Sequence, residues 1–184
     1  KFAYTTSVTD PIDFVMDVNG FKGPNSEARN GKQYDIRSFK VAKFSKGCAG
    51  VDVDGIGCVY VPPSYSPIKA GDPEMDKWDP KWNSKSCTTW SGNPCKTRDN
   101  YWAGAKKACD DIGMSLPDKS KLQSLAKKTT AEKEQLGLPT DGFFWSSSEG
   151  SAYGAYSVFF YGDGGGTNCY YKYNSDVKVL CVGD

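Results

Sequence analysis

The chain contains no histidine. Histidine is the commonest general base and the commonest transition-metal ligand of proteins, so a Ser-His-Asp or Cys-His nucleophile system cannot be built from these residues alone. Cys-x-x-Cys pairs are absent too, which argues against a zinc site and against thioredoxin-like redox chemistry. We therefore expect a protein that is not an enzyme, with no catalytic residue, no metal site and no cofactor.

Neither an excess of one charge nor a long apolar run is present. The 184 residues carry 23 Lys and Arg against 22 Asp and Glu, a net charge of +1. No overall field therefore attracts nucleic acid or an anionic membrane. No stretch reads as a signal peptide or is long enough to span a bilayer. We expect no nucleic-acid partner, and attachment to a membrane only through a segment absent from this chain.

Seven cysteines are many for a chain of this length. Without metal or redox motifs they indicate disulfides and an oxidising compartment, so we expect an extracellular protein, either secreted or at the cell surface, in a mature or trimmed form. Six cysteines can pair in many ways, and one is left over. The close spacings favour two local bridges, Cys48–Cys58 and Cys87–Cys95.

The first 70 residues read as β structure with turns. Residues 12–18 and 34–44 are extended runs, and Asn19-Gly20 is a strong hairpin signal. Residues 51–61 contain a further turn at Asp54-Gly55. Residues 64–99 are irregular, and we expect Trp78 and Trp82 of this region to pack onto the fold.

Two helices are expected next. Asn100 is a good N-cap and Gly113 a stop, while Asp118 or Ser120 can cap the second helix. Residues 130–135 are polar and indicate a loop or a single helical turn. The first helix carries its apolar face on Trp102, Ala105, Cys109 and Ile112, and the second on Leu122, Leu125 and Ala126.

Strands return after residue 142. Phe143-Phe144-Trp145 is apolar and expected in the core. Val158 and Phe160 alternate with Ser157, Phe159 and Tyr161, as residues of a strand do. The glycine-rich residues 162–166 predict a hairpin turn, and the alternation at 177–182 predicts a last strand.

The segment between residues 150 and 176 has an unusual composition. Of its 27 residues, 19 are Gly, Tyr, Ser, Asn or Asp. Tyrosine offers a large rigid face, while Ser, Gly and Asn give adaptable polar contacts, as in antibody loops. The alternative is a loop-rich β segment whose tyrosines are half-buried at strand edges.

Motifs in the second half of the chain resemble those of a known family. The helical part carries Tyr101-Trp102-Ala103-Gly104-Ala105, Cys109, Gly113-x-x-Leu116-Pro117, Leu122 and Leu125. The sheet part carries Phe144-Trp145-Ser146-Ser147-Ser148-Glu149, Ala155-Tyr156, Val158, Phe160, Gly164, Lys172 and Val179-Leu180-Cys181-Val182. Together they resemble a bacterial branch of C-type-lectin-like domains, exported proteins with a Trp-Ser-Ser-Ser-Glu signature. The resemblance implies an α+β fold, a ligand-binding domain over residues 71–184, and a disulfide between Cys109 and Cys181.

Some members of this branch are variable proteins of diversity-generating retroelements. Their mutated segments are rich in Tyr, Ser, Asp, Gly and Asn, as residues 150–176 are here. On this reading Cys169 is a product of diversification, whereas a fixed sequence is the alternative. Calcium-dependent sugar binders of the same fold use Glu-Pro-Asn or Gln-Pro-Asp with Trp-Asn-Asp, and none of these triplets occurs in the chain.

The N-terminal part resembles the globular part of type IV pilin-like subunits. The motifs are Phe14-Val15-Met16-Asp17-Val18-Asn19-Gly20, Lys22-Gly23-Pro24-Asn25, Tyr34-Asp35 and Phe39-Lys40-Val41. The resemblance implies a pilin-like antiparallel β segment over residues 1–70 that precedes the C-type-lectin-like domain, with other pilin subunits as partners.

The function expected from both resemblances is binding of an unidentified protein or glycan through a recognition face. The candidate ligand-binding residues are Ser151, Tyr153, Ser157, Phe159, Tyr161, Asn168, Tyr170, Tyr171, Tyr173, Asn174 and Asp176. Alternatives are a structural pilin with a fixed decorative domain and an enzyme related to the oxidase that generates formylglycine.

Overall fold

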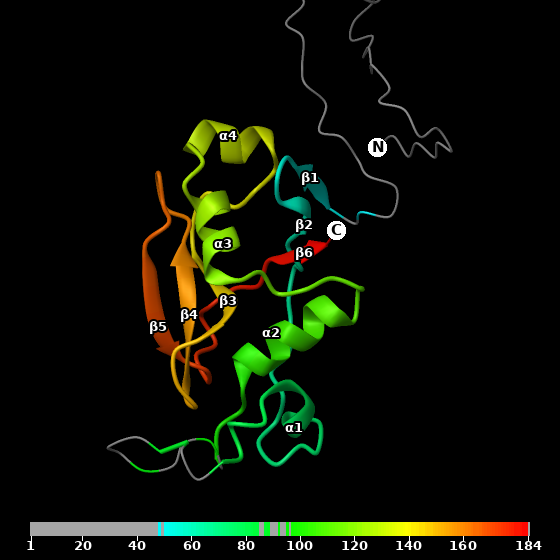
Figure 1. Cartoon of the computed structure of the whole chain (residues 1–184), viewed down its shortest axis with the longest axis vertical. Coiled ribbons are helices and arrows are strands. Elements are labelled where there is room, and N and C mark those ends of the chain that lie inside the picture. Colours follow the sequence, from blue (N-terminus) through cyan, green and yellow to red (C-terminus); the bar gives the residue numbers. More distant parts are fainter. Residues whose placement is uncertain are drawn as a thin grey trace, which may run out of the picture.

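Two small antiparallel sheets and four short helices make up the part of the chain that the computed structural model describes (Figure 1). This part comprises residue 48, residues 50–84, residues 87, 88, 92 and 95, and residues 97–183. It is an α+β structure, as predicted. The expected strands at 12–18 and 34–44, and most of the pilin-like segment, lie outside the described residues.

The first sheet has the strand order β1-β2-β6 and is antiparallel throughout. Its strands are β1 (Val51–Val53), β2 (Gly57–Tyr60) and β6 (Cys181–Gly183). The turn predicted at Asp54-Gly55 joins β1 to β2, and Gly55 adopts a φ of 73° that favours glycine. The predicted Cys48–Cys58 disulfide is present beside this hairpin.

The second sheet has the strand order β3-β4-β5. Its strands are β3 (Phe143–Glu149), β4 (Gly154–Phe159) and β5 (Thr167–Tyr171), and the predicted turn at 162–166 joins β4 to β5. Residues 177–180 extend the sheet beyond β3, because Phe144 and Lys178 form a parallel bridge. The stretch predicted as one last strand therefore serves both sheets.

The two expected helices form, and their caps are as predicted. The side chain of Asn100 accepts from the Ala103 N–H at the start of α2 (Tyr101–Asp110), and Asp118 accepts from the Lys121 N–H at the start of α3 (Lys119–Ala126). The placement of Ile112 on the apolar face of the first helix was wrong. The helix ends at Asp110, before the left-handed Gly113, and Ile112 is 44% exposed.

Two further helices were not expected as such. The polar residues 130–135 form α4 (Thr130–Gln135), which begins with a reciprocal capping box between Thr129 and Glu132. One turn of helix, α1 (Met75–Trp78), lies in the irregular region before α2. Trp78 and Trp82 are buried there, as predicted.

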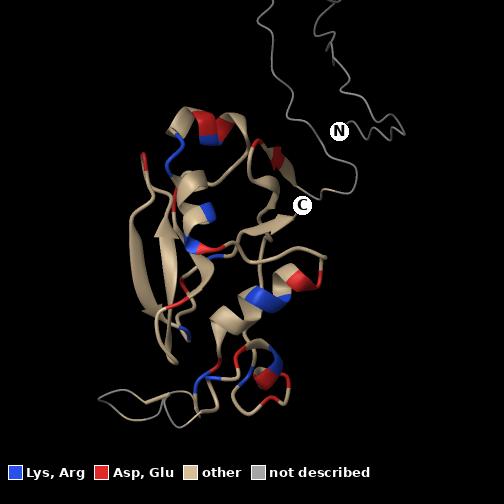
Figure 2. Ribbon diagram, viewed as in Figure 1, with Lys and Arg blue, Asp and Glu red and all other residues tan. Residues whose placement is uncertain are grey.

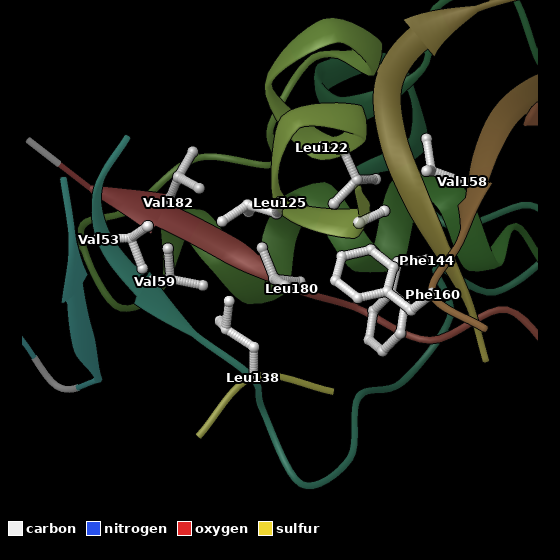
Figure 3. Close-up of a cluster of buried hydrophobic side chains, with 11 residues drawn as sticks. Val53, Val59, Leu122, Leu125, Leu138, Phe144, Val158, Phe160, Leu180 and Val182 are labelled. Atoms are coloured by element: carbon white, nitrogen blue, oxygen red, sulfur yellow. The ribbon is translucent and has the colours of Figure 1, made fainter. Parts of the chain in front are cut away.

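Helix α3 lies between the two sheets and joins their cores (Figure 1). Figure 3 shows Leu122 and Leu125 between Val59 of the first sheet and Phe144 of the second. Helix α2 packs through a separate cluster against the other face of the second sheet. That cluster contains Trp102, Ala105, Cys109, Trp145, Ala155, Val177, Val179 and Cys181.

Three disulfides and one free cysteine account for all seven cysteines. Cys109 of α2 is bonded to Cys181 of β6, with a Cα–Cα distance of 5.4 Å, as the family resemblance implied. The local bridge Cys87–Cys95 is present as well. Cys169 on β5 is free and exposed. Within the described residues, no helix is long and apolar enough to cross a bilayer.

Candidate recognition surface

Strands β4 and β5 contain no Lys, Arg, Asp or Glu. Figure 2 shows both strands in tan, without the blue or red of charged residues, which lie mainly on the helices and loops. The outer part of the second sheet therefore presents a neutral surface, and its large side chains are aromatic.

Three aromatic side chains gather around Phe143 on β3, and we call these four residues the Phe143 cluster. Its ring meets the rings of Phe159, Tyr170 and Tyr161 edge to face, at centroid distances of 4.8, 5.5 and 5.8 Å. Sheet register explains the arrangement, since Phe143 pairs with Phe159 across β3 and β4. Tyr161 is 55% exposed at the edge of the cluster.

A second group, the tyrosine stack, consists of Tyr153, Tyr171 and Tyr173. The rings of Tyr171 and Tyr173 are stacked, with centroids 5.0 Å apart and an interplanar angle of 7°. Tyr153 lies 5.9 Å from Tyr171, and the Arg98 guanidinium lies over the Tyr173 ring. Tyr171 is 40% exposed, while Tyr153 and Tyr173 pack partly against the buried cluster around Trp78. The stack thus packs against the buried cluster on one side and is exposed to solvent on the other.

The polar candidates border these aromatic groups. The Asn174 N–H donates to the Tyr171 carbonyl, and the Asn174 side chain accepts from the Asp176 N–H, which fixes the turn after the stack. Asn168 and Asp176 are exposed, whereas Ser151 and Asn174 are half-buried. Amide and carboxylate groups of this kind can supply oriented hydrogen bonds beside an aromatic contact.

Ser157 was expected on the exposed face and is buried, with none of its surface exposed. Strand β4 is the central strand, so position 157 is flanked by Trp145 on β3 and by Asn168 on β5. Alternation along a strand tells which face a side chain occupies, but not whether other side chains cover it. Its hydroxyl has no hydrogen-bond partner among the described residues. Ser157 is a core position, not part of the candidate surface.

The remaining candidates divide between two patches because neighbouring residues of β5 point to opposite faces of the sheet. Tyr170 pairs with Ala155, and Tyr171 pairs with Gly154. Tyr170 accordingly joins the Phe143 cluster, and Tyr171 joins the tyrosine stack. Phe143 and Arg98 were not expected in the two patches. Phe143 sits in an apolar run typical of a core, and Arg98 lies in an irregular region.

A network of charged side chains centred on the buried Lys172 supports the tyrosine stack. The sequence did not predict this network. The Lys172 N–H donates to the Tyr153 carbonyl, and its buried side chain forms salt bridges with Asp79 and Glu149. Lys81 pairs with the other oxygen of Glu149. Burial alone would raise the pKa of Glu149, but the hydrogen bonds from Lys172 and Lys81 outweigh it and hold the pKa below its ordinary value. The chain around the stack is therefore tied to the loop before α2.

Cys169 lies on β5 opposite Tyr156. Burial raises the pKa of its thiol, although the nearby Lys172 charge acts in the opposite direction. A raised pKa lowers the fraction of thiolate, the nucleophilic form, at neutral pH. Among the described residues, no group of three Cys, Asp or Glu side chains could hold a metal ion.

The half of the chain that carries both aromatic groups matches one family model. That model is described as a domain of unknown function, DUF8780, and the match covers residues 95–183. The matched segment extends from just before α2 to the end of β6. No curated protein and no solved structure matches the chain.

Proposed function

We propose that the chain is an extracellular binding protein whose C-type-lectin-like domain presents the tyrosine stack and the Phe143 cluster to a protein or glycan ligand. The observation that carries the proposal is the stacked pair Tyr171 and Tyr173, open to solvent on one side and packed on the other. Aromatic side chains that are held rigid before binding lose little conformational entropy when a ligand arrives.

The scaffold behind the surface supports this proposal. Disulfide Cys109–Cys181 links α2 to β6, and the second sheet is covered by α2 on one face and by α3 on the other. A rigid framework allows surface residues to change without unfolding the domain. Three disulfides are also what exported proteins carry, which supports an extracellular or pilus location.

The Gly-, Tyr-, Ser-, Asn- and Asp-rich composition of residues 150–176 supports a surface that differs between clones. Most of the candidate positions are exposed or half-exposed, and the free Cys169 belongs to none of the three bridges. Sequencing the gene from many clonal isolates tests this part. Diversification predicts changes at Tyr161, Tyr171 and Asn168 with Ser157 and Trp145 constant, together with a reverse transcriptase gene nearby. Changes spread evenly over the domain would rule it out.

Binding itself is tested with two variants of the purified chain. The double substitution Tyr171→Ala/Tyr173→Ala removes the stack, and Ile112→Ala removes an exposed apolar side chain beyond the end of α2 as the matched control. The probes are a printed glycan array and an array of extracellular proteins. The proposal predicts that the wild type and the control bind the same probe and that the stack variant loses it. Equal binding by all three proteins would contradict a role for the stack.

A further inference from the structure

Lys172 is a buried lysine that contacts two carboxylates. None of its side chain is exposed, and its Nζ lies 2.8 Å from Asp79 Oδ2 and 2.6 Å from Glu149 Oε1. Asp79 is buried as well, with 1% of its side chain exposed, whereas Glu149 is 21% exposed. A buried ion pair is costly because both charges lose their hydration.

The surroundings of the pair combine aromatic rings with a few polar groups, since Lys172 Nζ also donates to the Ala152 carbonyl at 3.0 Å. The Lys172 Nζ lies 4.4 Å from the centre of the Trp102 ring, and the neighbouring Trp78 and Trp82 are buried in the cluster around α1. Asp79 Oδ1 has no hydrogen-bond partner among the described residues. Transfer of one proton from the ammonium to the carboxylate gives a neutral amine and a neutral acid, which an apolar environment accepts at lower cost than the two ions.

We propose that Lys172 and Asp79 become joined by an intramolecular amide bond. The Nζ lone pair attacks Cγ of Asp79, so an Nζ–Cγ bond forms and the bond from Cγ to one carboxyl oxygen breaks. One water molecule leaves, made of that oxygen, its proton and a proton released by Nζ. Nothing is oxidised or reduced, so no co-reactant is needed. The Cγ atom is bonded directly to Oδ2, the oxygen that Nζ already contacts.

Two neighbouring side chains suit the steps of this reaction. Asn100 Nδ2 donates to Asp79 Oδ2 at 2.9 Å and would stabilise the negative charge that develops there after attack. Oδ1, which lacks a partner, is then the oxygen that is protonated and leaves. Glu149 Oε1 is within hydrogen-bond distance of Nζ, so this carboxylate is placed to take the proton that Nζ releases before that proton leaves with Oδ1 as part of the water molecule.

The bond would act as a fourth covalent link in the domain. It joins the loop after α1 to the residue that follows β5, across a sequence separation of 93. The backbone of Lys172 is hydrogen-bonded as well. Its carbonyl accepts from the Tyr101 N–H, and its N–H donates to the Tyr153 carbonyl. The link therefore ties the base of the tyrosine stack to the loop after α1, independently of whether the stack binds a ligand.

Intact-mass spectrometry of the reduced wild-type chain tests the proposal. We expect a mass lower by one water molecule than the mass of the sequence, and a branched peptide after protease digestion that contains both Asp79 and Lys172. A full mass, with the two residues in separate unmodified peptides, would overturn it. Peptide mapping is required because an Asp-Gly step such as Asp163-Gly164 can lose the same water by forming a succinimide.

Two variants separate the bond from the fold. Lys172→Arg keeps a buried positive charge but lacks the amine, so the branched peptide should be absent. Glu149→Gln keeps the size of the side chain but cannot accept the proton. Most molecules of a folded Glu149→Gln variant should therefore keep the full mass of the sequence and lack the branched peptide. Formation of the bond in Glu149→Gln to the wild-type extent would contradict the role given to Glu149. Persistence of the water loss in Lys172→Arg would contradict the assignment to Lys172.

Discussion

Lys133 is fully buried, although it forms no salt bridge within the described structure. Its Nζ donates to three carbonyl oxygens, those of Ala126 at the end of α3, Phe160 and Gly162. A positive charge at the C-terminal end of a helix is favourable, and the three carbonyls replace much of the lost hydration. One side chain thus joins α4 to α3 and to the end of β4.

Replacing Lys133 by Met should therefore lower the free energy of unfolding by about 1–3 kcal/mol, because buried carbonyls lose their donor. Urea unfolding measures the loss. Burial lowers the pKa of Lys133 in the folded state from its usual 10.5. Between the lowered folded-state pKa and the unfolded-state pKa, the unfolded protein binds more protons than the folded one. The stability of the wild type relative to Lys133→Met should therefore rise as the pH increases toward 10.5. A stability difference between the two proteins that stays constant or decreases over this pH range would contradict this account.

Position 157 should tolerate loss of its hydroxyl but not a larger side chain. Ser157→Ala removes a buried hydroxyl without a partner, so the melting temperature should stay the same or rise slightly. Ser157→Tyr should cost at least about 1–3 kcal/mol by overpacking between Trp145 and Asn168. Differential scanning calorimetry of both variants measures this. A stable Ser157→Tyr variant would return the residue to the exposed, variable set.

At this scale the sequence identified residue types better than residue environments. Tyr161 and Tyr171 were expected at the surface and are exposed there. The burial of Ser157 depends on the neighbours of the central strand, and that of Lys172 on Asp79, a residue distant in the chain. Local periodicity contains no information on such contacts, so both could be learned only from the folded structure.

Helix α2 packs closely on the chain before it. A Cβ atom added at Gly104 would lie 2.1 Å from the Ser66 carbonyl oxygen, which is far inside van der Waals contact. Gly104→Ala should therefore destabilise the protein by about 1–3 kcal/mol through overpacking, although Ala is favoured over Gly in a helix by about 1 kcal/mol. Ser120→Ala on the exposed side of α3 serves as the control and should be neutral or stabilising. Stabilisation by Gly104→Ala would contradict the close approach.

The helices with caps and an apolar face were predicted from sequence, whereas α4 was predicted only as a loop or a single helical turn. Asn100 and Asp118 accept the hydrogen bonds expected of N-caps. Residues 130–135 have no apolar stripe that would mark a buried helix face. The buried residue of α4 is instead the charged Lys133. The two roles of residues 177–182 were missed for a related reason, since alternation does not say which strand is the partner.

Over the whole molecule, the disulfides should differ in their contribution to stability. Cys109–Cys181 spans 72 residues, and chain entropy predicts a contribution of about 4 kcal/mol. Cys87–Cys95 spans 8 residues and should contribute less, about 2–3 kcal/mol. Urea unfolding of the two double Cys→Ala variants tests this order. An equal or larger loss from the local bridge would contradict the idea that the helix-to-strand link is the main covalent constraint.

The proposed function requires the tyrosine stack to be a recognition surface and not a part of the core. The most direct measurement is the binding of wild type and Tyr171→Ala/Tyr173→Ala to the same arrayed glycans and extracellular proteins, with the melting temperature of each recorded. Removal of a central aromatic contact costs about 2 kcal/mol or more, so we predict a loss of affinity of at least about tenfold, with a melting temperature close to that of the wild type. Unchanged affinity, or a wild type that binds no probe, would contradict the claim.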